Sequence, residues 1–432
     1  MKTPTIAIFD IGKTNKKLFL FNENYEIVYE KSTQFDETTD EDGDPCENVK
    51  LLSTWVVDTF NEISQHHDFE IKALNFSTYG ASFVHLDSEG KVIAPLYNYL
   101  KPYSEILKKQ FYDTYGGEQV FARKTASPVL GNLNSGMVLY RLKYENPTLF
   151  AQIHYSLHLP QYLSFLFTGQ YFSDITSIGC HTNLWDFEEN QYHEWVKKEG
   201  IEKKVAPLTP RGGVEVDYSF PLWGLGGFFG GFGLHDSSAA LIPYLATFKG
   251  QKFVLISTGT WCITLNPFNH TPLTDEELLQ DCLAYMQYTD NPVKASRLFA
   301  GNTHEQAIKE MAQRFGKPLD YYKTAKFDSQ LIENQNDNFY EGVYHQLIID
   351  LVNQQVTSTK LVLNDSTVTK LFVDGGFGKN EIYMNLLAKA FPEMEVYAAS
   401  VAQATALGAA LAIHEDWNTN EISLNLIELK RY

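Results

Sequence analysis

The sequence predicts an α/β fold made of two related halves, and three observations support this prediction. Short apolar runs typical of strands alternate with longer runs of helical periodicity. A strand, a glycine-containing turn and a second strand follow one another twice, first at the start of the chain and again from Lys252. Near the C-terminus a strand leads through a glycine-rich loop into a helix. Such distant self-similarity indicates two related domains rather than an array of short repeats.

The composition is that of a globular protein with a strongly acidic surface. The chain has 432 residues, of which 44% are hydrophobic and 20% are charged, and 35 Lys and Arg against 53 Asp and Glu give a formal charge of −18. This length allows two or three domains with large cores. The negative charge repels nucleic acids and anionic lipids, so we expect neither as a partner. It also repels nucleotides, so a nucleotide site must create its own local positive potential.

The start of the chain and the cysteines indicate a cytoplasmic protein. Asp10 interrupts the first apolar run, so we expect no signal peptide, and no run reaches the length of a membrane span. The four cysteines form no CxxC pair, and a chain of this size needs no disulfide bonds. We therefore expect reduced thiols.

Apolar spacing predicts the elements of the first half in the following order: strands at 6–9 and 18–21, a helix over 47–69, a strand at 73–76, and a hairpin of 83–86 with the run from 92. Residues 104–200 are predicted to be helical with short loops, and one helix ends at Gly169. Residues 211–236 are rich in glycine and aromatic residues and give no periodic pattern.

The second half is more regular. Its predicted elements are strands at 252–256 and 262–265, a long amphipathic helix over 340–352, a strand at 370–373, a helix opened by the loop 374–380, and a helix over 402–413. The last helix has a face of small residues, which predicts close contact with another backbone.

The turn DIGKTNKK at 10–17 has the components of a phosphate site. A phosphate chain needs a tight turn, hydroxyl or amide donors and a cation, and Asp10 could hold a water on Mg²⁺. The alternative is a solvated hairpin turn, since a short glycine motif is weak evidence. The candidate phosphate ligands are Gly12, Lys13, Thr14, Asn15 and Lys16.

Two further glycine turns follow buried strands. The turn STGTW contains Gly259 and Thr260, and the loop DGGFGKN contains Gly375, Gly376 and Asn380. A glycine-rich loop between a strand and a helix allows a nucleotide to approach the backbone, although such turns are also common without ligands. The spacing matches neither GxGxxG nor the P-loop, so a dinucleotide fold and a Walker-type fold are poorly supported.

The segment GLHDSSAA places Asp236 between an apolar run and a helix start. An aspartate in this position is commonly a helix N-cap. The functional alternative is a general base that takes a proton from a sugar hydroxyl. Phosphoryl transfer needs little more from a protein than positioning, charge neutralisation and such a base.

Six segments in this order resemble the FGGY family of carbohydrate kinases over essentially the whole chain: DIGKTNKK, STYGAS, GLHDSSAA, STGTW, DGGFGKN and QATALGAALA. Within that family the chain looks most like the rhamnulokinase and fuculokinase branch. The resemblance implies two actin-like ATPase domains of ribonuclease H type flanking a catalytic cleft. It places a sugar-binding domain at 1–245 and a nucleotide-binding domain at 246–432.

The resemblance implies an enzyme that uses ATP and Mg²⁺ to phosphorylate a small ketose or deoxyketose, similar to rhamnulose, fuculose or xylulose. Asp236 would be the catalytic base, and Asp10 would lie near the metal. The family's sugar-lining positions correspond to Gly80, Ala81, Ser82, His235 and Ser237. Its nucleotide positions correspond to Gly12, Lys13, Thr14, Asn15, Lys16, Gly259, Thr260, Gly375, Gly376, Asn380 and Gln403. Family members often form homodimers.

Three segments differ from the family. Many relatives carry Asp-x-Arg where this chain has Tyr97, Asn98 and Tyr99, and Phe377 stands where a third Gly or Ala is usual. The glycine and aromatic stretch from Trp223 to Phe232 is also not typical of the segment before the base. A non-catalytic actin-like or chaperone-like ATPase, or a sugar-responsive regulator, is the alternative function. An ATPase of that kind would not need a general base or a sugar-lining loop. The sequence shows no basic face that could bind DNA, which argues against the regulator.

Overall fold

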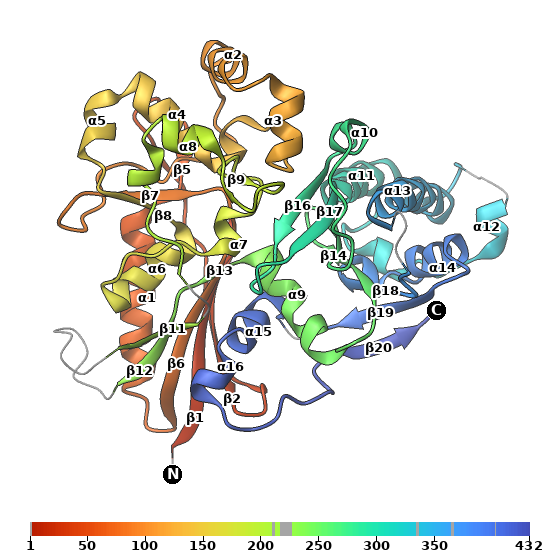
Figure 1. Cartoon of the computed structure of the whole chain (residues 1–432). Helices are drawn as coiled ribbons and strands as arrows, with labels where there is room; N and C mark the ends of the chain where they lie inside the picture. The colour runs from red at the N-terminus through yellow and green to blue at the C-terminus, as the bar shows by residue number, and fades with distance from the viewer. Residues whose placement is uncertain (1, 210–211, 217–226, 334–336, 364–366, 402) are drawn as a thin grey trace. The chain divides into compact units, whose positions relative to one another are not determined.

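A computed structural model describes residues 2–209, 212–216, 227–333, 337–363, 367–401 and 403–432 (Figure 1). The chain forms two compact units. The first consists of Met1–Ala246, Ala284–Pro292 and Gln403–Ser423, and the second of Thr247–Leu283, Val293–Ala402 and Leu424–Tyr432. The chain thus leaves the first unit next to the boundary expected at 245/246 and returns to it twice. In the described parts of the chain, no helix is both long and apolar enough to cross a membrane.

The first unit contains a seven-stranded sheet with the order β11-β12-β6-β1-β2-β3, and β13 also pairs with β6. Its strands are β1 Thr3–Ile11, β2 Lys16–Asn22, β3 Ile27–Thr33, β6 Phe69–Thr78, β11 Gly213–Val216, β12 Phe228–Gly231 and β13 Leu234–His235. The central strand β1 is buried on both faces, which explains its unbroken apolar run. One face packs on α1 and α6, and α15 contacts β1 and β6.

The second unit contains a seven-stranded sheet with the order β16-β17-β15-β14-β18-β19-β20. Its strands are β14 Phe253–Thr258, β15 Cys262–Asn266, β16 Cys282–Met286, β17 Pro292–Leu298, β18 Lys370–Gly375, β19 Glu395–Ser400 and β20 Glu428–Arg431. The last residues of β16 belong to the first unit.

The two sheets repeat one topology. In the first, β1, β2 and β3 form an antiparallel meander, β6 runs parallel to β1, and β12 runs parallel to β6. In the second, β14, β15 and β17 form the meander, β18 runs parallel to β14, and β19 runs parallel to β18. The prediction of an α/β fold with two related halves is confirmed.

Helices surround both sheets. Those of the first unit are α1 Val49–Ser64, α2 Glu105–Thr114, α3 Glu118–Lys124, α4 Ser135–Glu145, α5 Pro147–Gln152, α6 Leu159–Thr168, α7 Ile175–Ile178, α8 Glu194–Lys198, α9 Asp236–Thr247, α15 Ala404–Leu411 and α16 His414–Trp417. Those of the second unit are α10 Asp275–Leu279, α11 Ala300–Phe315, α12 Ser329–Glu333, α13 Tyr340–Leu363 and α14 Glu381–Ala390. Short strand pairs complete the first unit: β4 Thr38–Thr39 with β5 Pro45–Cys46, β7 Phe83–Leu86 with β8 Tyr155–His158, and β9 Trp185–Asp186 with β10 Gln191–Tyr192.

Two local predictions need correction. The expected hairpin from 83–86 to the run at 92 is reduced to a single bridge between Leu86 and Val92, because β7 pairs with the distant β8. The region 104–200 is helical only in part, because β8, β9 and β10 lie within it. Of residues 211–236, those at 211 and 217–226 lie outside the described residues, while β11, β12 and β13 account for most of the remainder.

The small-residue face of the last predicted helix is used as expected. A Cβ atom added at Gly408 of α15 would lie 1.9 Å from the carbonyl oxygen of Ala239 in α9. The two helix backbones are therefore in direct contact. This contact holds α9, which begins at Asp236, against α15, whose Thr405 reaches the end of β1.

Candidate active site

Asp10 is a partly exposed residue near the end of β1, between the buried Phe9 and Ile11. Its Oδ2 accepts a hydrogen bond of 2.8 Å from the hydroxyl of Thr405, and Lys17 lies opposite Asp10 in β2. Burial raises the pKa of Asp10 to about 6, and the negative charge of Asp236 adds to this rise. The Thr405 hydrogen bond and Lys17 act in the opposite direction. The two aspartates are thus close enough to interact electrostatically.

The turn after Asp10 is tight and open to solvent at its tip. The amide of Gly12 donates to the carbonyl of Asn15 over 2.9 Å, and the side chains of Thr14 and Asn15 are exposed. The ammonium of Lys13 lies 2.8 Å from a carboxylate oxygen of Glu37. Backbone, hydroxyl, amide and ammonium groups therefore gather at this turn, as a phosphate site requires.

Lys16 does not share this environment. Its side chain is buried, and its ammonium lies 3.0 Å from Glu47 and 2.9 Å from the carbonyl of Lys13. The Glu47 carboxylate also accepts from the hydroxyl of Tyr79 over 3.4 Å. Lys16 therefore stabilises the turn through its buried contacts with Glu47 and the carbonyl of Lys13. Lys17, which the sequence analysis left out of the site, is the lysine beside Asp10, and the strand register could have shown this.

The loop STYGAS packs against His235 at Gly80. A Cβ atom at Gly80 would lie 2.6 Å from the His235 ring, so only glycine fits there. Ala81 has φ 60°, a left-handed conformation that is uncommon for residues other than glycine. The hydroxyl of Ser82 donates to the Gly80 carbonyl over 3.4 Å. Gly80 and His235 are thus in direct contact, and Ala81 and Ser82 follow Gly80 in the same loop, while their role at a sugar stays a prediction.

Asp236 follows β13, which pairs with the end of β6. Its Oδ1 accepts from the amide and hydroxyl of Ser237 over 2.6 and 3.3 Å, and the Nε2 atom of His235 lies 3.3 Å away. The side chain is 35% exposed, and no donor among the described residues contacts Oδ2. The recorded contacts involve the next residue and not the amides two or three positions on, which an N-cap would bind. One carboxylate oxygen is therefore held in place and the other is free.

His235 supports Asp236 from a buried position. Burial lowers the pKa of its imidazole, so the ring is neutral near pH 7. Its backbone amide donates to the Thr176 hydroxyl over 3.0 Å, and its Nε2 lies 3.4 Å from the sulfur of Cys180. The ring stacks on Tyr285, with centroids 5.6 Å apart and planes inclined by 23°. The sequence analysis missed these three supporting residues because each is remote along the chain.

The second turn is joined to the glycine loop. The amide of Gly259 donates to the carbonyl of Trp261 over 2.9 Å, so this turn is one residue shorter than the one closed by Gly12 and Asn15, and Thr260 is exposed. The Thr258 hydroxyl donates to the carbonyl of Asp374 and accepts from the amide of Phe377 over 3.1 Å. A left-handed Gly375, with φ 90°, lets the loop pass within contact of Thr258.

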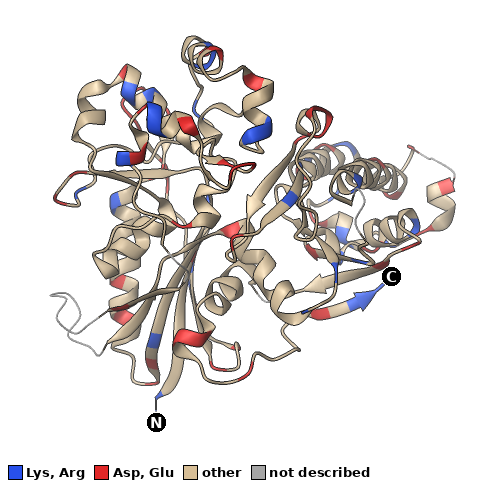
Figure 2. Ribbon diagram, in the orientation of Figure 1, with Lys and Arg blue, Asp and Glu red and all other residues tan. Residues whose placement is uncertain are grey.

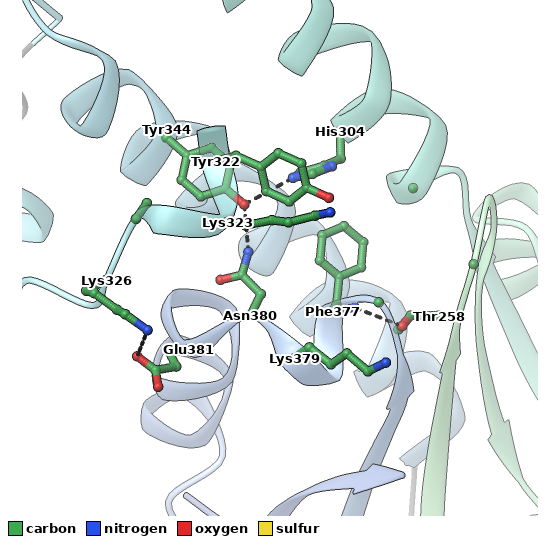
Figure 3. A pocket seen from close by; sticks show the side chains of 14 residues that line it. Thr258, His304, Tyr322, Lys323, Lys326, Tyr344, Phe377, Lys379, Asn380 and Glu381 are labelled. Carbon is green, nitrogen blue, oxygen red and sulfur yellow. Dashed lines mark hydrogen bonds and ion pairs between the residues drawn. The ribbon is translucent and has the colours of Figure 1, made fainter. Parts of the chain in front are cut away.

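A pocket of about 560 Å³ opens beside this junction in the second unit (Figure 3). Its aromatic lining comes from His304 of α11, Tyr322, Tyr344 of α13 and Phe377. Asn380 caps α14 through its Oδ1 and donates through Nδ2 to the hydroxyl of Tyr344 over 2.8 Å. The lining also includes Thr258, Gly259, Gly301, Lys323, Ala325, Lys326, Gly376, Lys379 and Glu381.

Comparison with known proteins shows which family the chain resembles. Residues 5–210 match the N-terminal domain of the FGGY family of carbohydrate kinases. This part of the chain is an FGGY N-terminal domain. A rhamnulokinase of Mannheimia succiniciproducens is 24% identical over 63% of this chain and 55% of its own length. An L-fuculokinase of Escherichia coli K12 is 19% identical over 61% of this chain and 57% of its own length. The aligned regions thus span little more than half of these two relatives.

Solved structures of sugar kinases share the fold of this chain over nearly its whole length. A carbohydrate kinase from Novosphingobium aromaticivorans has a TM-score of 0.79 at 22% identity, covering 98% of this chain and 95% of its own. A ligand-bound xylulose kinase from Lactobacillus acidophilus has a TM-score of 0.81 at 16% identity, covering 99% and 93%. The prediction of two actin-like, ribonuclease H-like domains is confirmed.

The FGGY resemblance assigned Gln403 to the nucleotide. Gln403 belongs to the first unit, where it begins α15 with φ 54°, and it does not line the pocket of the second unit. The lining residues that the sequence analysis missed lie on α11, on α13, in the segment 322–326 and at Glu381 of α14.

The segment where FGGY relatives carry Asp-x-Arg has three different environments in this chain. Tyr97 is buried, donates to Glu41 over 2.6 Å and packs on Arg141. Asn98 is also buried and accepts from the amide of Leu100. Tyr99 remains partly exposed beside Tyr79, and the Asp236 charge adds to the effect of burial in raising the pKa of Tyr99. Tyr99 is therefore the member of this segment that lies near the carboxylate.

The donor set at Asp10 fits a magnesium ion. Mg²⁺ prefers oxygen ligands and usually keeps several waters, so one carboxylate can suffice as the protein contribution. Asp10 Oδ1 has no hydrogen-bond donor in the described part of the chain, while Oδ2 is held by Thr405. A carboxylate with one oxygen fixed and one available can hold an ion or its water.

Proposed function

We propose that this protein transfers the terminal phosphoryl group of ATP to a hydroxyl of a small ketose or deoxyketose. The match to the FGGY N-terminal domain supports phosphoryl transfer to a carbohydrate, and the matched rhamnulokinases and L-fuculokinases suggest the sugar class. The observation that carries the proposal is Asp236, which presents one free carboxylate oxygen beside the Gly80–Ser82 loop. We also propose that the protein acts in the cytoplasm, and a homodimer remains a prediction.

In this proposal Asp236 Oδ2 takes the proton from the attacking hydroxyl. Oδ1 cannot rotate freely, because Ser237 and His235 hold it. The neutral His235 ring is proposed to orient Oδ1 and takes no part in the proton transfer. A positioned base contributes about 10²–10⁴-fold to the rate.

In the first unit, Gly12–Asn15 are proposed to bind phosphate. In the second unit, Gly259 and Thr260 are proposed to contact phosphates of the nucleotide, and Gly376 and Asn380 to adjoin the adenosine. A Cβ atom at Gly376 would meet nothing within 4 Å, which leaves room for a ligand to approach the backbone. Mg²⁺, held at Asp10, would neutralise charge on the phosphates when bound. Lys16 is left out of this set because its ammonium is committed to Glu47.

A coupled ADP-release assay over ketoses, deoxyketoses, aldoses and polyols tests the function. We expect ATP turnover to depend on an added ketose or deoxyketose, with other sugars much slower. An equal rate of ADP release with and without added sugar would identify an ATPase of the actin or chaperone type. Sugar binding without any ADP release would favour a regulator. Either result would overturn the proposal.

A further inference from the structure

The pocket of the second unit is positively charged in a protein that is otherwise acidic. Three lysines line it against a single glutamate, whereas the whole chain has a formal charge of −18. Acidic side chains occur throughout both units (Figure 2). His304 does not add to the positive charge, because burial lowers its pKa to about 4. The local potential of the pocket therefore depends on Lys323, Lys326 and Lys379.

The three lysines are not equivalent. Lys326 lies 3.8 Å from the carboxylate of Glu381 and is partly neutralised by it. Lys323 and Lys379 have no acidic partner among the described residues, and both are exposed. Other lysines of the unit form close pairs with acids, as Lys309 does with Glu305 over 2.7 Å. Two uncompensated ammonium groups at one cavity indicate an anionic ligand.

The direction of the side chains adds to this indication (Figure 3). Lys379 extends toward Thr258, at the end of the pocket formed by the second turn. Lys323 extends between Tyr322 and Phe377, into the aromatic part. The aromatic rings can stack on the base of a nucleotide, and their faces carry no formal charge. Discrimination by charge must therefore come from the two lysines.

We propose that Lys323 and Lys379 are specificity-determining residues that make this pocket select nucleoside polyphosphates over the nucleoside and monophosphate. The proposal rests on the proposed function, because it assumes that the pocket takes a nucleotide. The two ammonium groups supply the local positive potential that an acidic chain requires for binding ATP. Charge-assisted contacts with phosphate are strong, and long-range attraction to an exposed ammonium is screened by salt. Selectivity for phosphate number is therefore greatest at low ionic strength.

Calorimetric titration of the full chain with ATP, ADP, AMP and adenosine tests the proposal at about 20 and 300 mM salt, concentrations that span the onset of strong screening. The variants are Lys323→Gln, Lys379→Gln and the double variant. Lys389→Gln is the matched control, since Lys389 is an exposed lysine of α14 that does not line the pocket. We expect about 5–10-fold weaker ATP binding for each single variant at low salt, and a nearly additive loss in the double variant.

Adenosine affinity should stay within about twofold in every variant, and the control should bind ATP normally. The salt dependence of ATP binding should flatten in the double variant. Equal losses for adenosine and ATP, or unchanged ATP binding in the double variant, would overturn the assignment of the lysines and leave the proposed function intact. If the unmodified chain binds no nucleotide at all, both the proposed function and this inference fail.

Discussion

Replacing Asp236 with asparagine separates catalysis from structure at the candidate base. The asparagine Oδ1 can accept the same contacts from Ser237 and His235 that the structure records for the carboxylate. What changes is the free oxygen, which becomes an amide nitrogen and cannot take a proton. The variant therefore keeps the geometry of the loop and loses the proposed chemistry.

The expected magnitudes differ for rate and stability. Loss of a positioned base predicts a fall in kcat of about 10²–10⁴-fold, equivalent to roughly 3–5 kcal/mol of activation free energy. The free energy of unfolding should change by less than about 1 kcal/mol, because the contacts of Oδ1 survive. Removing the Asp236 charge should also lower the pKa of Asp10, since that charge contributes to its rise.

The assay is coupled ADP release at saturating ATP and sugar, together with urea denaturation of both proteins. Ser237→Ala is the control, since it removes one hydroxyl contact with Oδ1 and leaves the carboxylate; we expect it to lose less than about tenfold in rate. Normal turnover by Asp236→Asn would refute the assignment of the base. If the asparagine variant does not fold, Asp236→Ser is measured instead, and the same rate loss is expected.

Three further predictions concern the turns and the buried charges. Thr260→Val should raise the KM for ATP or lower kcat with sugar affinity nearly unchanged; loss of sugar binding alone in direct titrations would reverse the assignment of this turn. Asp10 has a raised pKa, so its folded form retains a proton that the unfolded form releases, and stability falls as pH rises from about 4 to 6. Asp10→Asn should remove this fall and add about 1–2 kcal/mol to the free energy of unfolding at pH 7, measured by urea titration across pH, while activity is lost. Lys16→Met leaves Glu47 buried without its partner, so the free energy of unfolding should fall by about 3–5 kcal/mol. The nucleotide affinity of the folded protein should not change. A Lys16→Met protein that is fully stable but binds ATP poorly would return Lys16 to the phosphate site.

The sequence alone determined the elements whose signal is local. The strands on either side of Gly12 and Gly259 are marked by apolar runs, and the turns between them by glycine and hydroxyl residues. The helix predicted to end at Gly169 does so, and Gly169 has φ 65°. Periodicity and turn chemistry act over a few residues, so they can be recognised without knowing the fold. The order of six such segments carried the resemblance to the FGGY family.

Only the tertiary structure decided which distant side chains share an environment. Lys16 looked like a phosphate ligand because it stands in a basic run, yet the fold buries it against Glu47. Tyr285 stacks on His235 because part of β16 belongs to the first unit, and no local pattern marks that. Pocket residues such as His304 and Tyr344 meet because α11 and α13 pack together. Contacts of this kind form because the burial of apolar surface brings together residues that are distant in the sequence. A short sequence window does not contain that information.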